Sequence, residues 1–110
     1  MSKETISFSG FSKLDIRIGK ILKVAEVEGL DKLYKLTVNI GGETKTLLAG
    51  LREVYSVVEL IGKQIVVVVN LEPKTVKGIT SEGMLLAADV NGKPILLQPE
   101  EVVPAGTIVR

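Results

Sequence analysis

The chain has 110 residues, with 14 Lys and Arg against 13 Asp and Glu, no His and no Cys. This length fits one domain with one core, over residues 1–110. Without imidazole or thiol, the chain cannot supply a Ser-His-Asp triad, a catalytic cysteine, a disulfide or a zinc site built from His and Cys. The remaining carboxylates, amines and hydroxyls form no obvious cluster in the sequence, so we expect neither a metal nor another cofactor.

Apolar segments in this chain are too short for a membrane span. The longest apolar run, at 65–69, falls far below the roughly 20 residues that a helix needs to cross a bilayer. The first residues are polar and lack the apolar core of a signal peptide. We therefore expect a soluble, cytoplasmic protein that does not associate with membranes.

Val and Ile are abundant, which favours strands because β-branched side chains fit a pleated, half-buried surface. From Leu14 to Val24, even-numbered apolar residues alternate with polar ones, and this pattern predicts a long strand with one face in water. Lys20 interrupts the alternation. Gly19, just before it, predicts a bend or bulge where the strand changes the side that faces the core.

The next segments predict a meander followed by a helix. A second strand is predicted over 33–40, and the pair Gly41-Gly42 turns the chain into a third strand over 44–49. Over 51–61 the apolar residues recur at spacings of three and four, which indicates one short helix. Gly62 ends that helix.

The second half of the chain predicts two more strands of the barrel. Residues 64–71 contain a continuous apolar run, typical of a strand covered on both faces, so this strand should be the most buried. A polar connection is predicted over 72–83, before strand character resumes over 84–90. The dipeptide Asn91-Gly92 is a strong two-residue turn signal that leads into 94–97.

This order of elements predicts an all-β fold, a five-stranded OB-fold (oligonucleotide/oligosaccharide-binding) Greek-key barrel with one short helix between the third and fourth strands. An SH3-like barrel and a small sandwich remain alternatives, because periodicity does not fix topology. Residues 93–110 form an apolar C-terminal extension beyond the fifth strand. The extension either closes one end of the barrel or forms part of a two-fold dimer interface.

Basic residues concentrate at two places in the sequence. Those around the predicted first strand are Lys13, Arg17, Lys20 and Lys23, offset only by Asp15. The other two, Lys74 and Lys77, lie in the connection between the fourth and fifth strands. Either group alone is typical of solvated surface, but such barrels bind nucleic acid through one sheet face and through this connection. Together, on such a barrel, the two groups support nucleic-acid binding about as well as ordinary solvated surface.

Aromatic side chains that could stack on bases are few. Tyr34 and Tyr55 fall in phase with core positions, and we expect Phe8 and Phe11 to anchor the N-terminus. Generic binders of single strands rely on aromatic stacking, so that mode is poorly supported. A folded RNA recognised by shape and phosphates needs fewer aromatic residues.

Three separated motifs resemble those of the tRNA-binding domain family. They are Leu14-Asp15-Ile16-Arg17-Ile18-Gly19-Lys20-Ile21, Asn70-Leu71-Glu72-Pro73-Lys74 and Lys77-Gly78-Ile79-Thr80-Ser81-Glu82-Gly83-Met84. That family includes the C-terminal region or separate beta subunit of methionyl-tRNA synthetase, free-standing tRNA-binding proteins and the C-terminal module of the endothelial monocyte-activating polypeptide. The resemblance covers residues 11–110. It implies an OB-fold barrel that recognises tRNA by shape near the outer corner of the L, and a homodimer in members that exist alone.

The resemblance also implies a set of RNA-facing residues, comprising Arg17, Lys20, Asn70, Lys74, Lys77, Ser81 and Met84. The lysines can neutralise phosphates. Lys77 stands where many relatives have Arg, which keeps the charge but loses bidentate geometry. Arg17 has a rival interpretation, because it can pair with Asp15 or Glu82 instead of RNA.

Three other members of this set have structural alternatives. Asn70 either bonds a base edge or terminates its strand through hydrogen bonds to the backbone. Ser81 either donates to phosphate or stabilises its loop. Met84 either packs on a base or fills the core.

Two other functional classes compete with RNA binding. Ser81, Glu82 and Lys77 suggest a hydroxyl nucleophile with an amine base, but no third group or oxyanion site can be identified, so we expect no enzymatic activity. A related secretion-chaperone-like family has the same barrel, binds peptides and shares parts of the first and third motifs. The segment 49–51 lies closer to the tRNA-binding members than to those chaperones, which makes a peptide-binding chaperone the second hypothesis.

The sequence therefore predicts a non-catalytic, structure-specific tRNA-binding protein. It is expected to increase the tRNA affinity of methionyl-tRNA synthetase as a beta subunit or appended module, or to hold tRNA as a free-standing protein. Because the chain begins at its own Met1 without an upstream catalytic domain, a separate subunit or standalone protein is expected. The expected partners are tRNA, a second copy of the chain and the methionyl-tRNA synthetase catalytic chain.

Overall fold

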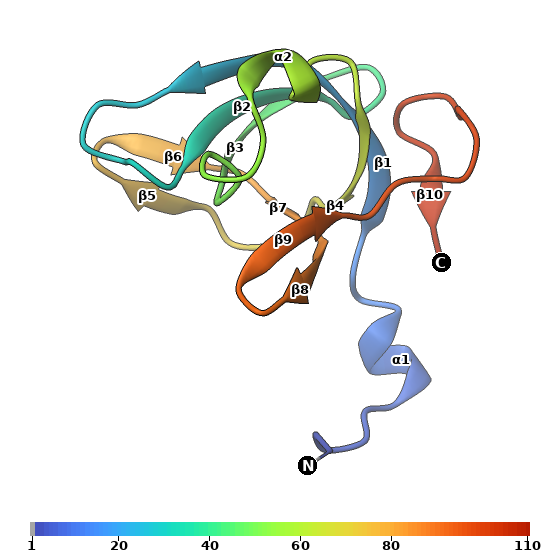
Figure 1. Cartoon of the computed structure of the whole chain (residues 1–110). Coiled ribbons are helices and arrows are strands. Elements are labelled where there is room, and N and C mark those ends of the chain that lie inside the picture. Colours follow the sequence, from blue (N-terminus) through green and yellow to red (C-terminus); the bar gives the residue numbers. More distant parts are fainter. Residues whose placement is uncertain (1) are drawn as a thin grey trace.

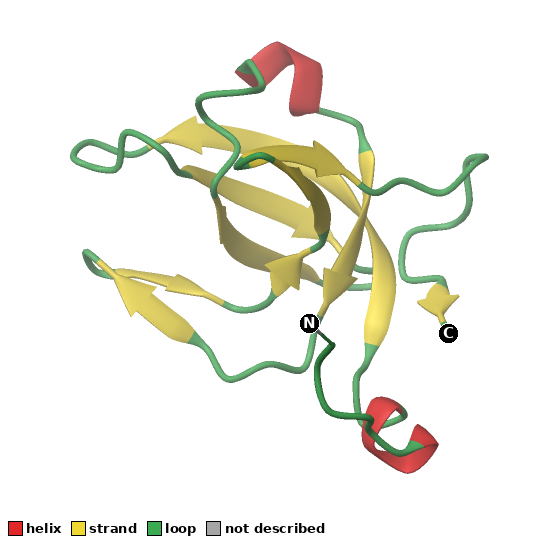
Figure 2. Cartoon of the chain, turned by 60° about the horizontal axis from the view of Figure 1, so that its bottom comes forward, coloured by secondary structure: helices red, strands yellow, loops and turns green. Residues whose placement is uncertain are grey.

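A computed structural model describes residues 2–110 and shows a barrel formed by one curved, six-stranded antiparallel sheet (Figure 1). Its strands are β1 (Ile16–Glu26), β2 (Tyr34–Asn39), β3 (Thr44–Ala49), β4 (Gln64–Val68), β7 (Met84–Leu85) and β10 (Ile108–Val109). The strand order is β3-β2-β1-β4-β7, with β10 also paired to β1. In the turned view of Figure 2 the strands curve around the interior of the barrel. The predicted all-β barrel is confirmed.

The long first strand belongs to two parts of the barrel. Its first half pairs with β4 and its second half with β2, and a bulge lies between Ile21 and Lys23. Gly19 faces the interior, where an added Cβ would lie 2.5 Å from Val38 Cγ1. The predicted irregularity is therefore real, but the bulge follows Gly19. Ile18, Gly19 and Ile21 are buried while Lys20 is exposed, so the inward face of the strand changes at Gly19. Leu14 and Leu22, which the alternation placed inside, are 42% and 40% exposed, because Leu14 lies before the strand and Leu22 lies at the bulge.

The core is filled by branched aliphatic side chains from the strands and from the segment after β3. The most deeply buried of these are Ile21, Leu36, Val38, Leu47, Leu51, Leu60, Ile65 and Val67. Tyr34 is buried beside Tyr55, and its hydroxyl donates to the Tyr55 carbonyl oxygen at 2.7 Å. Both tyrosines thus belong to the core or its margin, as predicted, and neither is placed to stack on a base.

The helix between β3 and β4 is shorter than predicted. Helix α2 spans only Val57–Leu60, because Ser56 adopts an extended conformation and caps it. The Ser56 side chain accepts from the Glu59 N–H, and the Glu59 carboxylate accepts from the Ser56 N–H. The two hydrogen bonds form a capping box. Leu51 is still buried, but it reaches the core from a turn. The spacing therefore misjudged the helix start. It also misjudged the inward face of the helix, because Val58, which it placed inside, is 84% exposed and Leu60 is buried instead.

Residues 72–83 were predicted as a polar connection without strands. This prediction is wrong, because the segment contains a second small sheet. Strands β5 (Lys74–Val76) and β6 (Ile79–Ser81) pair as a hairpin that projects beside the barrel (Figure 1). The two turn residues, Lys77 and Gly78, have positive φ angles of 50° and 78°. This backbone is typical of a two-residue hairpin turn, but Lys is an unusual first residue for it, so the sequence signal was weak.

The predicted fifth strand is divided. After β7, strands β8 (Ala87–Val90) and β9 (Lys93–Leu96) form a separate hairpin around Asn91-Gly92, which confirms the predicted turn. The last residues then return to the barrel, where the Gly106 N–H donates to the Ile18 carbonyl at 2.7 Å and β10 pairs with the start of β1. The C-terminal extension thus packs against its own barrel.

The N-terminal segment contains one short helix, α1 (Phe8–Phe11), which lies away from the barrel in Figure 1. Phe8 is 81% exposed and Phe11 is 40% exposed. In the single chain, the expectation that these two side chains anchor the N-terminus is therefore wrong. Over residues 2–110, no helix has the length and apolar character that crossing a bilayer requires.

Candidate nucleic-acid interface

Strand register brings three lysines onto the outward side of β1, β2 and β3. Leu36 and Val38 point inward, so the residues between them point outward, and residues paired across an antiparallel ladder share one face. The polar residues at these outward positions form a surface that we call the lysine face. It comprises Lys20, Lys23, Lys35, Thr37, Asn39, Thr44 and Thr46. No outward position of these paired strands is Asp or Glu, so the face is positively charged.

The lysines of this face are available to a ligand. All three are exposed, and within residues 2–110 none of their ammonium groups lies within ion-pair distance of a carboxylate. Threonine hydroxyls and the Asn39 amide alternate with them and can donate to phosphate oxygens. The arrangement therefore suits a polyanion that crosses the three strands.

An apolar groove of about 320 Å³ begins beside the lysine face, where Leu48 lies opposite Lys35. Its apolar lining comes from four parts of the chain and comprises Leu33, Leu48, Leu71, Val76 and Met84. Glu72, Lys74 and Ser81 also line it. The structure thus brings Lys74, Ser81 and Met84, three of the residues implied by the motifs, to one place.

The tip of the β5–β6 hairpin is tied to the loop between β1 and β2. The Lys77 Nζ donates to the Gly29 carbonyl oxygen at 3.3 Å, and a Cβ on Gly29 would lie 2.6 Å from that nitrogen. Gly29 also has φ of 81°, so glycine suits this close approach. Lys77 directly follows Val76, which lines the groove, and in this sense it lies at the rim of the groove. Its ammonium group keeps two N–H donors for a ligand.

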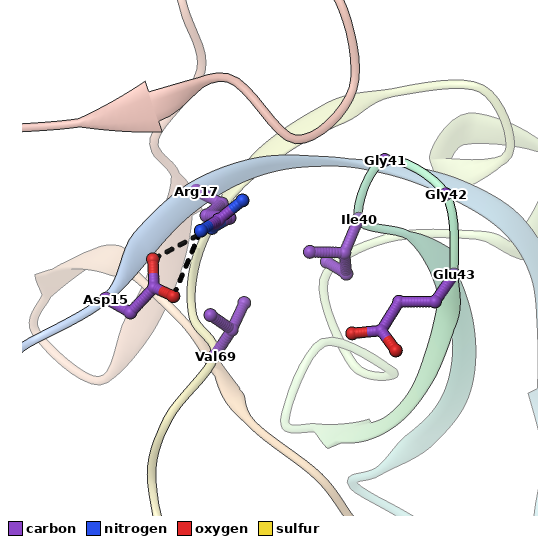
Figure 3. A pocket seen from close by; sticks show the side chains of 7 residues that line it. All are labelled: Asp15, Arg17, Ile40, Gly41, Gly42, Glu43 and Val69. Atoms are coloured by element: carbon purple, nitrogen blue, oxygen red, sulfur yellow. Dashed lines mark hydrogen bonds and ion pairs between the residues drawn. The ribbon is translucent and has the colours of Figure 1, made fainter.

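Arg17 lies apart from the lysine face, in a pocket of about 400 Å³ between the start of β1 and the β2–β3 turn (Figure 3). Its Nε donates to Asp15 Oδ1 at 2.8 Å and its Nη2 to Oδ2 at 3.3 Å. This hydrogen bonding, followed by the charge of Asp15, raises the pKa of Arg17 above its ordinary value. Arg17 thus makes the ion pair with Asp15 that was its rival interpretation, and Glu43 lines the same pocket.

Asn70 and Ser81 use their side chains to hold the backbone. The Asn70 Oδ1 accepts from the Asp15 N–H at 2.8 Å, and its Nδ2 donates to the Lys13 carbonyl at 2.7 Å. The Ser81 Oγ accepts from the Leu48 N–H at 3.0 Å and donates to the Gly83 carbonyl at 3.1 Å. Both residues therefore make the structural contacts that were the alternatives to RNA binding.

The arrangement of lysines and groove agrees with the comparison with known families. A model of the family described as "Putative tRNA binding domain" matches residues 16–108. The chain belongs to this tRNA-binding domain family.

Relatives of this tRNA-binding domain include methionine–tRNA ligases. The chain is 50% identical over 105 residues to the methionine–tRNA ligase of Pyrococcus furiosus, and the match covers 96% of this chain and 14% of that relative. A solved structure, the MetRS related protein from Pyrococcus horikoshii, is 35% identical with a TM-score of 0.91, covering 98% of this chain and 100% of that one.

The tRNA-binding domain also resembles a chaperone in structure. The chaperone CsaA from Bacillus anthracis is 34% identical with a TM-score of 0.88, and the match covers 97% of this chain and 100% of that chain. This likeness matches the second hypothesis from the sequence, but the family model and the ligase relatives support the tRNA-binding interpretation better.

Three functional candidates of the tRNA-binding domain escaped the set implied by the motifs. Lys23 was counted only as part of a basic concentration, and Lys35 and Thr37 lie in the predicted second strand, where they were given no functional role. The signal that combines them is the β1–β2 register, in which Lys23 lies opposite Thr37. The predicted meander made these strands neighbours, but the sequence pattern does not give their register, which shifts at the bulge, so this face could not be assembled beforehand.

Proposed function

We propose that this chain, acting as one domain without catalytic activity of its own, binds folded tRNA through the lysine face and the neighbouring groove. The observation that supports the proposal most directly is the match to the tRNA-binding domain family over nearly the whole barrel. The lysine face adds a physical reason, because adjacent strands lie about 4.8 Å apart and place several cations along one phosphate backbone. Of the residues implied by the motifs, Lys20, Lys74, Lys77 and Met84 are the RNA-facing ones in this proposal.

The proposed role is to increase the tRNA affinity of methionyl-tRNA synthetase, as a beta subunit or as an appended module. The chain spans only 14% of the Pyrococcus furiosus ligase that it resembles, so the ligase has a large part outside the match. A tethered tRNA-binding module raises the effective concentration of tRNA near that part without contacting the chemistry. Such a role belongs in the cytoplasm.

We also propose that the protein acts as a homodimer. An apolar surface, which we call the termini patch, lies where the N-terminal helix meets β10 and comprises Phe8, Phe11, Leu14 and Ile108. These side chains line one pocket of about 410 Å³ and are all at least 40% exposed. Exposed apolar side chains gathered in this way favour burial against a partner, and a two-fold dimer would bury two copies of the patch at once.

A peptide-binding chaperone is the second candidate function. The likeness to the chaperone CsaA from Bacillus anthracis supports it, and the apolar groove offers a place for a side chain. Electrostatic contact separates the two candidates, because a neutral peptide releases no counterions when it binds.

The test measures binding of the full chain to folded tRNA, unfolded tRNA and an unstructured neutral peptide across a salt series. We expect folded tRNA to bind best, and log affinity to fall linearly with log salt, with a slope of about 0.9 for each phosphate contacted. The triple variant Lys20→Ala, Lys23→Ala, Lys35→Ala should bind more weakly with a shallower slope. The matched control is Lys93→Ala, in the β8–β9 hairpin away from the face. Equal binding to the peptide without salt dependence would contradict the proposal.

A further inference from the structure

The apolar groove combines a preformed shape with side chains that a free domain would normally bury. Met84 is 50% exposed and Leu71 is 39% exposed, and both line the same groove. No aromatic residue lines it, within the part of the chain that the structure describes. The groove therefore offers aliphatic contact area that nothing in residues 2–110 covers.

Hydrogen bonds on both sides hold the walls of the groove. Ser81 joins the wall at Leu48 to the chain at Gly83, with bonds of 3.0 Å and 3.1 Å. Lys77 connects the hairpin, which contributes Val76, to the loop before β2, which contributes Leu33. Because these walls are held in place before binding, a ligand needs little ordering of the protein.

A peptide that adds as a strand is disfavoured here, because the nearby edge of β3 is already paired. The Thr46 N–H donates to Glu82 Oε1 at 2.8 Å, and the Thr46 carbonyl accepts from the Glu82 N–H at 2.8 Å. The Leu48 N–H donates to the Ser81 Oγ. Binding by strand addition relies on free backbone groups at a sheet edge, and these groups are occupied.

The charges around the groove favour a nucleotide instead. Lys74 lines the groove, Lys77 lies at its rim, and Lys35 points outward opposite Leu48. A base in the groove would therefore have cations on both sides for its flanking phosphates. Bases within a helix are stacked and present only their edges, so only an unpaired nucleotide can place its face against aliphatic walls.

Glu72 limits which base suits the groove. Among the described residues that line the groove, Glu72 alone carries a carboxylate. An ionised carboxylate can only accept hydrogen bonds. Cytosine presents an exocyclic amino donor where uracil presents a carbonyl oxygen. A base with an amino group therefore fits this position better than uracil.

We propose that the groove binds one unpaired nucleobase, preferably one with an exocyclic amino group, while the flanking phosphates contact the lysine face, Lys74 and Lys77. This inference rests on the proposed function and adds to it a requirement for an unpaired nucleotide in the bound RNA.

The experiment uses the full chain and three RNA hairpins that share one stem and one loop. Each carries a single extra position in the stem, which is an unpaired cytidine, an unpaired uridine or an abasic site. Fluorescence anisotropy measures the three affinities. We expect the cytidine hairpin to bind roughly tenfold more tightly than the abasic hairpin, because the base buries aliphatic surface of the groove, and more tightly than the uridine hairpin.

Two variants separate the contributions of the groove. Met84→Ala combined with Leu71→Ala should bring the cytidine and uridine hairpins to the abasic affinity while leaving the salt slope unchanged. The matched control is Val58→Ala combined with Val102→Ala, which removes apolar atoms from side chains that are 84% and 88% exposed elsewhere. Glu72→Gln should reduce the preference for cytidine over uridine. This substitution keeps the size of an exposed residue, so it tests the proposal even if the apolar variant folds poorly.

The possible results distinguish the proposed base site in the groove from the proposed binding of tRNA. Equal affinity for all three hairpins with a normal salt slope would overturn the base site and leave tRNA binding intact. Failure of every hairpin and of folded tRNA to bind would overturn both. An apolar peptide that binds the wild type but not the Met84→Ala, Leu71→Ala variant, with RNA affinity independent of the base, would assign the groove to peptides and overturn the proposal.

Discussion

Polar side chains from the motifs serve two different purposes in this molecule. Asn70 and Ser81 satisfy backbone groups that lie far away in the sequence, and their hydrogen-bonding capacity is largely occupied. Lys74 is exposed at the groove, where it is available to a ligand. A polar residue in a binding motif therefore need not contact the ligand, and its hydrogen bonds tell the two purposes apart.

Substitution of Asn70 should test this distinction. Asn70→Ala leaves the Asp15 N–H and the Lys13 carbonyl without their side-chain partner. Because these bonds are exposed, we expect the free energy of unfolding to fall by about 0.5–1.5 kcal/mol, as measured by urea denaturation, with unchanged tRNA affinity of the folded protein. Lys74→Ala should show the opposite result, weaker binding at unchanged stability. Weakened binding without loss of stability in Asn70→Ala would mean that Asn70 contacts RNA.

At the scale of elements, short segments are stabilised by specific termini and turns. Helix α2 has only four residues, too few to be stable alone, and it depends on its capping box and on burial of Leu60. The C-terminal segment depends on a close approach between two glycines, in which a Cβ on Gly106 would lie 3.0 Å from the Gly41 Cα.

The capping box should make stability depend on pH. The hydrogen bond from the Ser56 N–H, followed by that with its side chain, lowers the pKa of Glu59. A lowered folded-state pKa contributes stability above the ordinary Glu pKa of about 4.3, and this contribution is lost as pH falls through the folded value. Glu59→Gln keeps an acceptor but cannot titrate, so its unfolding free energy should fall less on acidification than that of the wild type. Glu53→Gln, outside the capping box, is the control for urea denaturation, and identical curves for wild type and Glu59→Gln would contradict this account.

The approach of the C-terminal segment to the β2–β3 turn should tolerate only glycine at position 106. Gly106 has φ of 91°, and an added Cβ would lie 2.6 Å from the Ile40 carbonyl oxygen. Gly92→Ala is a matched control, because Gly92 has φ of 84° with nothing within 4 Å of an added Cβ. We expect Gly106→Ala to lower the unfolding free energy by about 1–3 kcal/mol more than Gly92→Ala does. Equal melting temperatures for the two variants would show that the close approach has no energetic cost.

At the scale of the whole molecule, the lysine face and the termini patch occupy different parts of the fold. The lysine face covers β1, β2 and β3, while the termini patch lies where α1 meets β10. A dimer formed through the termini patch would leave the lysine face of each copy open to RNA. Deletion of the C-terminal residues would be a poor test of such a dimer, because it removes β10 and the Gly106 contact from the same barrel.

Single charges in the termini patch should therefore test the dimer. Phe8→Glu and Ile108→Glu each place a carboxylate where the proposed interface would bury an apolar side chain, and burial of an unpaired charge is costly. Sedimentation should show conversion of dimer to monomer with retained barrel structure. Val58→Glu, at an exposed apolar residue outside the patch, should leave the assembly unchanged. A dimer that persists in both patch variants would rule out this interface.

Local sequence patterns predicted much of the fold. Alternating apolar residues located β2, and the Gly41-Gly42 turn located β3, both almost to the residue. Asn91-Gly92 marked its hairpin in the same way, because these features depend only on neighbours in the chain. The same reasoning missed the β5–β6 hairpin, since Lys77 adopts a positive φ that is unusual for its residue type. It also missed the true start of α2, where Ser56 caps the helix.

The sequence by itself determined the barrel class, the absence of imidazole and thiol chemistry, and the motifs of the tRNA-binding family, because composition and spacing are local properties. Only the tertiary structure decided which charged residues act together. Strand pairing placed Lys35 on one face with Lys20 and Lys23, and Asn70 met the Asp15 N–H across 55 residues of chain. Such contacts depend on register and on long-range closure of the barrel, which the order of residues along one strand does not reveal.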